Sequence, residues 1–131
     1  MRVLALDHGS VRTGVAISDE TATLARPLTV LDRVETEAGF AALLAVVRGE
    51  APGCVVVGLP VSLDGREHAQ AARARAFAGR LAAAVDLPVE LYDERFTSRL
   101  ADQRGGRAAR DARAAATLLE DYLRIIGDRQ P

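Results

Sequence analysis

The sequence contains no lysine, and all 17 of its Lys and Arg residues are arginine. Chemistry that depends on a lysine amine is therefore excluded, including a Schiff base, a lysine general base and the lysine of a phosphate-binding P-loop. Tryptophan is also absent, and Cys54 is the single cysteine. One cysteine can form neither an intrachain disulfide nor a cysteine-based zinc site, and it fits a reducing compartment such as the cytoplasm.

Long apolar runs are also missing. Only the four apolar residues Val3–Leu6 separate Arg2 from Asp7, which is too short for the core of a signal peptide. No run approaches the roughly 18 apolar residues that span a bilayer. We therefore expect a cytoplasmic protein without a membrane segment. The length of 131 residues, of which 49% are hydrophobic, predicts a single globular domain over residues 1–131.

The apolar pattern predicts five strands and four helices. Continuous apolar runs are typical of buried strands, and stripes at three- and four-residue spacing are typical of amphipathic helices. The predicted strands are Val3–Leu6, Thr13–Ser18, Leu28–Leu31, Cys54–Val57 and Val89–Tyr92. The predicted helices are Glu35–Gly49, Glu67–Val85, Thr97–Gln103 and Ala108–Ile126. The order β-β-β-α-β-α-β-α-α predicts an α/β fold, in which a five-stranded mixed sheet is flanked by helices.

Three acidic residues stand near the ends of these elements. Asp7 follows the first predicted strand, Glu94 follows the fifth, and Asp111 lies in the first turn of the last helix. Spacings of four and eight place Asp111 on the apolar stripe of Ala115 and Leu119, so that its carboxylate faces the sheet. If the first and fifth strands run parallel and close together, three carboxylates converge. One or two Mg²⁺ or Mn²⁺ ions would relieve their repulsion and suit in-line phosphodiester displacement.

Each acid also has an ordinary structural explanation. An aspartate before a glycine forms turns, a glutamate after a strand is solvated, and an aspartate early in a helix interacts with the helix dipole. The glycine-containing segments are equally ambiguous. Gly9 with Gly14, and Gly58 with Pro60, could line a phosphate site, or could serve a tight hairpin and a strand end. His8 could touch a scissile phosphate or lie on the surface.

The charge is unevenly distributed along the chain. Residues 95–113 contain six arginines and two acidic residues, a net charge of +4, whereas the whole chain carries −1. A basic segment beside an acidic cluster is what nucleic-acid phosphates require, although a solvated helix surface has the same composition. Arg95 could clamp a phosphate or pair with Asp93 or Asp64. The candidate nucleic-acid-binding residues are Arg95, Arg99, Arg104, Arg107 and Arg110.

Four blocks of sequence together form a recognisable pattern. They are Leu4–Gly9 with Arg12–Asp19, Val57–Pro60 with Asp64–Gly65, Asp93–Thr97, and Asp111 followed by Ala114–Ala115 and Leu118–Leu123. In this order they resemble the bacterial pre-16S rRNA nuclease family, which is Holliday junction resolvase-like and has an RNase H-like fold. The resemblance covers essentially the whole chain. It implies that Asp7, Glu94 and Asp111 bind metal in a nuclease for structured nucleic acid, with the 5′ end of the 16S rRNA precursor as the implied substrate.

The chain departs from the family pattern in two places. His8 stands where the family usually has an aromatic residue, and the 16 residues between Glu94 and Asp111 form a shorter segment than the family's lysine- and arginine-rich one. The short basic segment keeps open a non-catalytic nucleic-acid or ribosome-assembly binding module on the same fold. Fold relatives keep open a Holliday junction resolvase that acts on DNA.

A third alternative comes from the first hairpin alone. Asp7, Gly9, Gly14 and Asp19 also resemble the phosphate loop of actin-like sugar kinases and ATPases, which close two such domains around a nucleotide. A chain of this length supplies only one of them. We therefore expect RNA as the partner, with branched DNA as the alternative and no membrane. We expect the protein to be a monomer or a weak homodimer.

Overall fold

The computed structural model describes residues 1–60, 69–93 and 107–129, with only the backbone of residues 107–110 and 127–129. Within these ranges, five strands and three helices follow in the order β-β-β-α-β-α-β-α. The strands are β1 (Val3–Asp7), β2 (Arg12–Ser18), β3 (Ala25–Asp32), β4 (Cys54–Leu59) and β5 (Val89–Asp93). The helices are α1 (Glu37–Glu50), α2 (Ala69–Ala84) and α3 (Arg107–Arg129).

The five strands form one mixed sheet in the order β3-β2-β1-β4-β5. Strands β1, β2 and β3 are antiparallel neighbours, whereas β4 runs parallel to β1 and β5 runs parallel to β4. This topology confirms the predicted five-stranded mixed α/β sheet. Because β1 and β5 point the same way on either side of β4, their carboxyl ends lie at one edge of the sheet.

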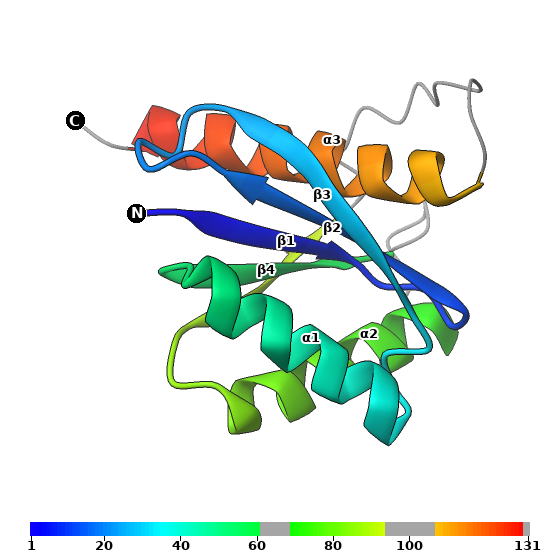
Figure 1. Cartoon of the computed structure of the whole chain (residues 1–131). Helices are drawn as coiled ribbons and strands as arrows, with labels where there is room; N and C mark the ends of the chain where they lie inside the picture. The colour runs from blue at the N-terminus through cyan, green and yellow to red at the C-terminus, as the bar shows by residue number, and fades with distance from the viewer. Residues whose placement is uncertain (61–68, 94–106, 130–131) are drawn as a thin grey trace.

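Helices cover both faces of the sheet. Figure 1 shows α3 on one face and α1 with α2 on the other. Along β1, Leu4 and Leu6 pack in the core with α1 and α2, whereas Val3 and Ala5 pack in the core with α3. A strand covered on both sides is apolar throughout, which is why its sequence shows no alternation. In the described ranges, no helix is long and apolar enough to cross a membrane.

Several elements extend past their predicted ends. Strand β3 begins at Ala25 and contains Pro27, which its position at the edge of the sheet tolerates. The predicted end of the fourth strand before Gly58 is wrong, because the buried apolar run continues through this residue. Helix α3 begins at Arg107, so that Asp111 is its fifth residue and the predicted place in the first turn is also wrong.

Local side-chain contacts explain where α1 begins and ends. The hydroxyl of Thr36 accepts a hydrogen bond from the backbone N–H of Gly39 at 3.1 Å, which satisfies one of the free amides at the start of a helix. The helix ends at Glu50, and the next residue, Ala51, caps it with a left-handed backbone at a φ of 48°. Pro52 follows and cannot continue the helix.

Candidate active site

Asp7 is the last residue of β1 and stands on the face of the sheet that α3 covers. Side chains alternate along a strand, and Asp7 follows Val3 and Ala5, which both pack in the α3 core. In the β1–β2 ladder, Asp7 lies opposite Gly14. Directly opposed residues share a face and have Cα atoms about 5 Å apart. The position beside Asp7 on this face therefore carries no side chain.

Gly14 is where the backbone of α3 meets the sheet beside Asp7. A Cβ atom at this position would lie 1.9 Å from the carbonyl oxygen of Asp111 and 3.2 Å from the amide nitrogen of Ala112. Only a glycine allows a helix backbone to approach a strand this closely. The contact carries Asp111 over the Asp7–Gly14 pair. Two aspartates from opposite ends of the sequence thus meet on one face.

The Asp111 side chain is held by Arg12, the first residue of β2. The Nε–H of Arg12 donates a hydrogen bond of 2.8 Å to Oδ2 of Asp111. Both side chains are partly exposed, with 30% of Arg12 and 33% of Asp111 accessible. The carboxylate of Asp111 therefore has a cationic partner at the partly exposed start of α3.

The predicted inward stripe of the last helix is confirmed by its apolar members. Ala115 and Leu119 are completely buried, and Asp111 continues their line toward the start of α3. The helix dipole acts mainly within the first turn. Because Asp111 is the fifth residue of α3, its interaction with Arg12 is a better explanation of its place than the dipole.

Strand β5 adds polar side chains to the same face. The hydroxyl of Tyr122 in α3 donates a hydrogen bond to Glu90, and Tyr92 packs edge-on against Tyr122 with ring centroids 5.9 Å apart. Burial, together with the bond to Glu90, raises the pKa of Tyr122 further above neutral pH. Tyr92 of β5 pairs with Gly58 of β4. Gly58 directly follows the β4 residue that pairs with Leu6 of β1. The carboxyl ends of β1 and β5 therefore lie at one edge, on either side of β4.

Four predicted site residues lie outside the described ranges. They are Glu94, Arg95, Arg99 and Arg104. The predicted helix over Thr97–Gln103 is outside them as well, and Arg107 and Arg110 are described by their backbone in the first turn of α3. Among the described residues, no three His, Cys, Asp or Glu side chains gather as metal ligands. Two of the three predicted acids, Asp7 and Asp111, are nevertheless brought together.

The predicted site glycines have different structural roles. A Cβ atom on Gly9 would lie 2.3 Å from the carbonyl oxygen of Arg12, so this glycine serves the tight turn between β1 and β2. Gly58 belongs to β4 and pairs with Tyr92, so the predicted loop position is wrong. On the α3 face, Gly58 leaves the space between β1 and β5 free of a side chain. Pro60, the first residue after β4, is half-buried.

His8 points away from the two aspartates. It continues the alternation of Leu4 and Leu6 and stacks on Phe77 of α2 with ring centroids 4.6 Å apart. Only 3% of its side chain is exposed, and its Nε2 lies 3.2 Å from Glu35 in poor alignment for a hydrogen bond. Burial lowers the pKa of His8, an effect that Glu35 partly offsets. The predicted surface position is therefore wrong, and the ring packs against α2 on the face opposite the two aspartates.

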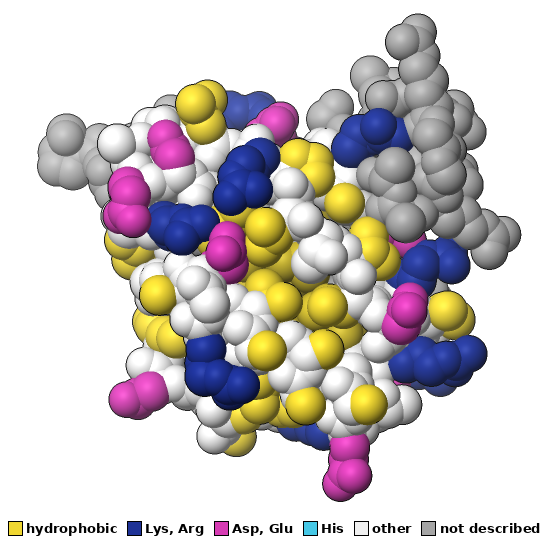
Figure 2. All heavy atoms as spheres, viewed as in Figure 1, with side chains coloured by type: hydrophobic (Ala, Val, Ile, Leu, Met, Phe, Trp, Pro, Cys, Tyr) yellow, Lys and Arg dark blue, Asp and Glu magenta, His cyan; other side chains and the backbone are white. Residues whose placement is uncertain are grey.

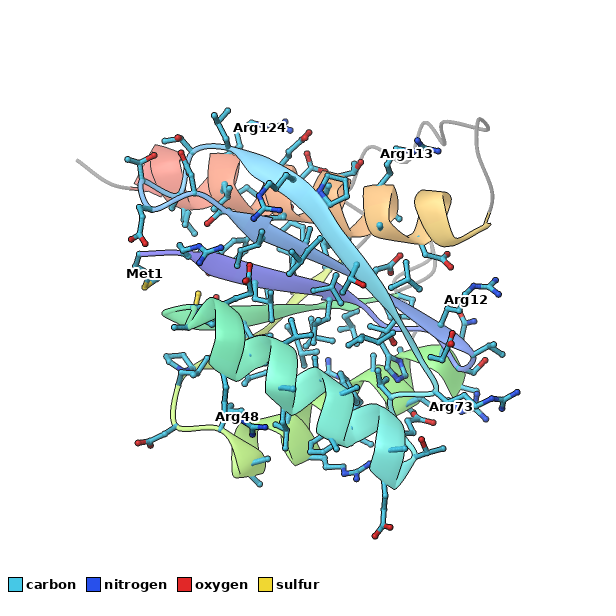
Figure 3. All side chains as sticks on the ribbon, viewed as in Figure 1. Met1, Arg12, Arg48, Arg73, Arg113 and Arg124 are labelled. Atoms are coloured by element: carbon cyan, nitrogen blue, oxygen red, sulfur yellow. The ribbon has the colours of Figure 1, made fainter. Side chains whose placement is uncertain are left out.

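Arginines other than the five candidate nucleic-acid-binding residues lie on the same side of the molecule as the two aspartates. In Figure 3, Arg12 from β2 and Arg73 from α2 extend at the right of the molecule, and Arg113 from α3 lies above them. Figure 2 shows arginine side chains on this side with acidic side chains between them. Charge runs along the sequence could not reveal Arg12, which stands alone in a segment without a basic excess. Arg73 lies in α2, whose sequence holds three arginines and no acidic residue.

A cavity on the opposite side of the sheet has a different character. It lies between the ends of α1 and α2, where β4 and β5 begin, and its lining is mostly apolar. The lining residues are Leu44, Val47, Arg48, Ala51, Pro52, Ala84, Val85, Asp86 and Leu87. None of the predicted site residues is among them. The chemistry-bearing residues therefore gather at the carboxyl end of β1, away from this cavity.

The sheet order, the helices on both faces and the aspartate at the end of β1 define a protein with an RNase H-like fold. The structure resembles "Thermus thermophilus RuvC structure" with a TM-score of 0.53 and 20% identity, covering 95% of this chain and 96% of that one. The same protein "in complex with Holliday junction substrate" matches with a TM-score of 0.53 and 21% identity, over the same shares of both chains.

Sequence comparison identifies the family. Residues 1–125 match the family described as "RuvX: Holliday junction resolvase". A "Putative pre-16S rRNA nuclease" of Anaeromyxobacter sp. (strain Fw109-5) is 45% identical, covering 94% of this chain and 96% of the relative. One of the same name from Maridesulfovibrio salexigens is 38% identical, covering 94% and 98%. The chain belongs to the RuvX family, which confirms the resemblance to pre-16S rRNA nucleases. Because the similarity is not restricted to the first hairpin, it favours a nuclease over an actin-like kinase.

Proposed function

We propose that this protein is a divalent-metal-dependent endonuclease that cuts structured RNA at the 5′ end of the 16S rRNA precursor. In this proposal, Asp7, Glu94 and Asp111 hold one or two Mg²⁺ or Mn²⁺ ions. One observation carries the proposal: the contact between Gly14 and the backbone of α3 brings Asp111 over Asp7. This contact joins two acids that are 104 positions apart in the sequence.

The residues at this place fit a hard divalent cation. The donors are carboxylate oxygens, which Mg²⁺ and Mn²⁺ prefer. The guanidinium of Arg12 stands against Asp111, so one carboxylate of this pair already has a positive partner. Gly14 and Gly58, on either side of Asp7, place no side chain of their own on the α3 face, and the backbone of α3 covers Gly14. The chain enters this edge from β5 directly before Glu94, which adds the third carboxylate in the proposal.

The divalent ions would supply Lewis acidity for in-line displacement at a phosphodiester by water. The chain itself fixes where that chemistry takes place. Asp7 is anchored by the ladder of β1, and Asp111 is anchored by α3 and by Arg12. Gly9, Gly58 and Pro60 line the site in this proposal without filling it. Because rigid elements hold these groups, they are preorganised before the substrate binds.

Arginines would bind the phosphates on either side of the cut. The proposed set is Arg95, Arg99, Arg104, Arg107 and Arg110. Arg73 and Arg113 lie at the same end of the molecule (Figure 3), which extends the basic surface beyond the segment between Glu94 and Asp111. Binding through phosphates is weakened by salt, so the affinity for RNA should fall steeply as ionic strength rises.

The Asp7→Asn variant tests the catalytic proposal. Asparagine keeps the shape of the side chain and removes the charge that would hold a cation, so cleavage of a 16S rRNA precursor fragment in Mn²⁺ should be lost. Circular dichroism should show an intact fold. Asp86→Asn, which changes an exposed aspartate away from the site, is the matched control and should cleave normally. Undiminished cleavage by Asp7→Asn would contradict the proposal.

A non-catalytic RNA-binding module on the same fold is the second candidate function. It is favoured by the ion pair of Arg12 with Asp111, because a neutralised acid has less need of a metal. Calorimetric titration with Mn²⁺ separates the two functions. The nuclease binds Mn²⁺ through Asp7, whereas the binding module binds RNA equally well with and without Mn²⁺ and cleaves none.

Substrate choice, location and assembly belong to the same proposal. We propose a cytoplasmic protein of one domain over residues 1–131, acting as a monomer or a weak homodimer. Parallel cleavage assays on the rRNA precursor and on a four-way DNA junction decide between RNA and branched DNA. Light scattering after size-exclusion chromatography measures the assembly state.

A further inference from the structure

The ion pair between Arg12 and Asp111 joins two elements that are far apart in the sequence. The bond runs from Nε of Arg12 to Oδ2 of Asp111 at 2.8 Å and links residues separated by 99 positions. A hydrogen bond between charged groups at this distance is short and directional. It therefore determines how the carboxylate is turned about its last side-chain bond, a rotation that otherwise has broad minima.

The backbone of Arg12 is well anchored for this task. Arg12 opens β2 and is paired with Asp32 of β3 in the antiparallel ladder. Next to it, the N–H of Arg33 donates a hydrogen bond of 2.8 Å to the carbonyl of Val11. The guanidinium thus extends toward α3 from a fixed strand end. Asp111, whose side chain is 33% exposed, has less packing of its own to hold it.

Stability is a weak explanation for such a pair. Ion pairs between partly exposed side chains contribute only about 0–1 kcal/mol, because water and salt screen them. The α3 helix is already held to the sheet by its buried residues, including Ala115 and Leu119. What the bond does determine is which oxygen of Asp111 faces β2 and which is left for another partner.

We propose that Arg12 is a positioning residue, which holds Oδ2 of Asp111 and thereby presents Oδ1 to a divalent cation beside Asp7. This role rests on the metal site of the proposed function. Groups that orient metal ligands through hydrogen bonds typically change metal affinity 10- to 100-fold when they are replaced. The positive charge of Arg12 acts in the opposite direction, because it repels a dication. Orientation and charge therefore predict opposite effects of its removal.

The affinity of the whole protein for Mn²⁺, measured without nucleic acid, shows whether the orienting effect of Arg12 or its charge is larger. Arg12→Met removes the donor and the charge but keeps an unbranched apolar stem, and Arg12→Lys keeps the charge without the Nε–H. We expect both variants to weaken Mn²⁺ binding about 10-fold or more. In an Asp111→Asn background, the further change Arg12→Met should have no effect, because Arg12 acts through Asp111.

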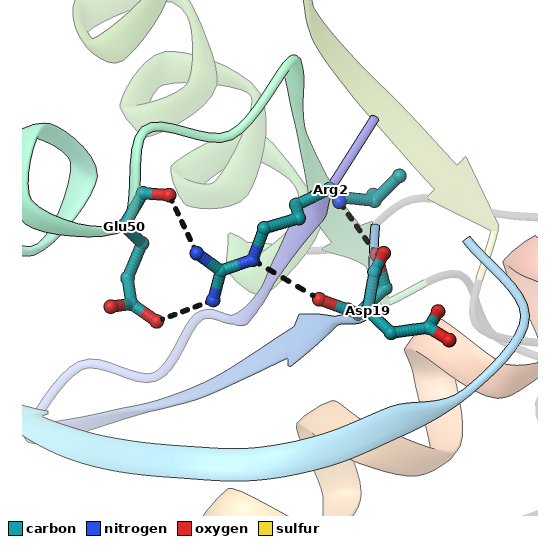
Figure 4. A network of polar contacts seen from close by, with 5 residues as sticks. Arg2, Asp19 and Glu50 are labelled. Carbon is teal, nitrogen blue, oxygen red and sulfur yellow. Dashed lines mark hydrogen bonds and ion pairs between the residues drawn. The ribbon is translucent and has the colours of Figure 1, made fainter. Parts of the chain in front are cut away.

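Arg2→Met is a matched control. Arg2 also makes a partly exposed ion pair, with Glu50 at 2.9 Å and 24% exposure on both sides, at the other end of β1 (Figure 4). Its loss should leave Mn²⁺ binding unchanged, while thermal melting reports how much each ion pair contributes to stability. If the Arg2 and Arg12 variants lose the same stability and only the Arg12 variants lose Mn²⁺ affinity, Arg12 acts by positioning Asp111 and not by stabilising the fold.

Other results overturn the role of Arg12. Unchanged Mn²⁺ affinity in both variants refutes it. Tighter binding by Arg12→Met with normal binding by Arg12→Lys shows that only charge matters. A further loss in the Asp111→Asn background shows that Arg12 does not act through Asp111, and loss of the fold in both variants makes the pair structural. If the unsubstituted protein binds Mn²⁺ no better than Asp7→Asn does, the proposed function itself fails.

Discussion

Replacing Gly14 by alanine tests whether the approach of α3 to the sheet creates the site. The new Cβ atom would stand 1.9 Å from the carbonyl oxygen of Asp111 and 2.5 Å from its carbonyl carbon. These are backbone atoms, so no side-chain rotation can relieve the clash. The start of α3 would have to move by about 1.1 Å before the Cβ–oxygen distance reached 3.0 Å.

Both stability and activity should respond to this movement. Overpacking inside a well-packed protein costs about 1–3 kcal/mol, and α3 has little room because Ala115, Leu118 and Leu119 are buried behind the clash. A displacement of about 1 Å in a catalytic group can cost on the order of 100-fold in rate. We therefore expect Gly14→Ala to unfold at lower urea concentration and to cleave roughly 100-fold more slowly.

The assay compares single-turnover cleavage of an rRNA precursor fragment in saturating Mn²⁺ with urea unfolding of the same preparations. Gly49→Ala is the matched control, because nothing lies within 4 Å of a Cβ at this position in α1. It should leave cleavage unchanged and raise stability by about 0.5–1 kcal/mol, since alanine is the better helix former. If Gly14→Ala cleaves at the normal rate, the contact does not position Asp111 and the reasoning is refuted.

Two further predictions concern local structure. The pKa of Asp19 is lowered mainly by hydrogen bonds from the backbone N–H groups of Thr23 and Leu24, so its charged form is favoured in the folded protein. This stabilisation is present above the unfolded pKa of about 3.9 and is lost as the pH falls below it, so Asp19→Asn should flatten the acid limb of a plot of stability against pH. An unchanged acid limb would show that Asp19 does not stabilise the turn. Thr36→Ala removes the N-cap of α1 and should cost about 1 kcal/mol in urea unfolding. A midpoint equal to that of the unsubstituted protein would show that the hydroxyl contact with Gly39 contributes nothing.

The strands and helices were largely predictable because their signals are local. The apolar runs that become β1 and β4 are buried on both sides, and the helical stripes of α1 and α2 keep their spacing in the structure. The wrong predictions concern the residues at which strands and helices begin or end. The run of β4 continues through Gly58, since its backbone pairs with Tyr92, and glycine carries no hydrophobic signal that could announce this.

In the candidate site, the meeting of two acids was predictable from the sequence, and the residues that support them were not. Asp7 and Asp111 could be singled out from their positions beside a strand end and on an apolar stripe. Arg12 could not, because its partner is 99 residues away. The buried position of His8 could have been predicted, because His8 continues the alternation by which Leu4 and Leu6 face the core. Gly14 stood out as a turn residue, yet its neighbour is the α3 backbone.

The sequence by itself determined the fold class and the family. Periodicity, composition and short motifs depend on neighbouring residues, and the absence of lysine limits chemistry in any fold. Only the tertiary structure decided which groups meet: Asp7 with Asp111, Arg12 with Asp111, and His8 with Phe77. These contacts follow from the register of the ladders and from how closely α3 can approach a glycine. Such distances arise between distant segments and leave no pattern along the chain.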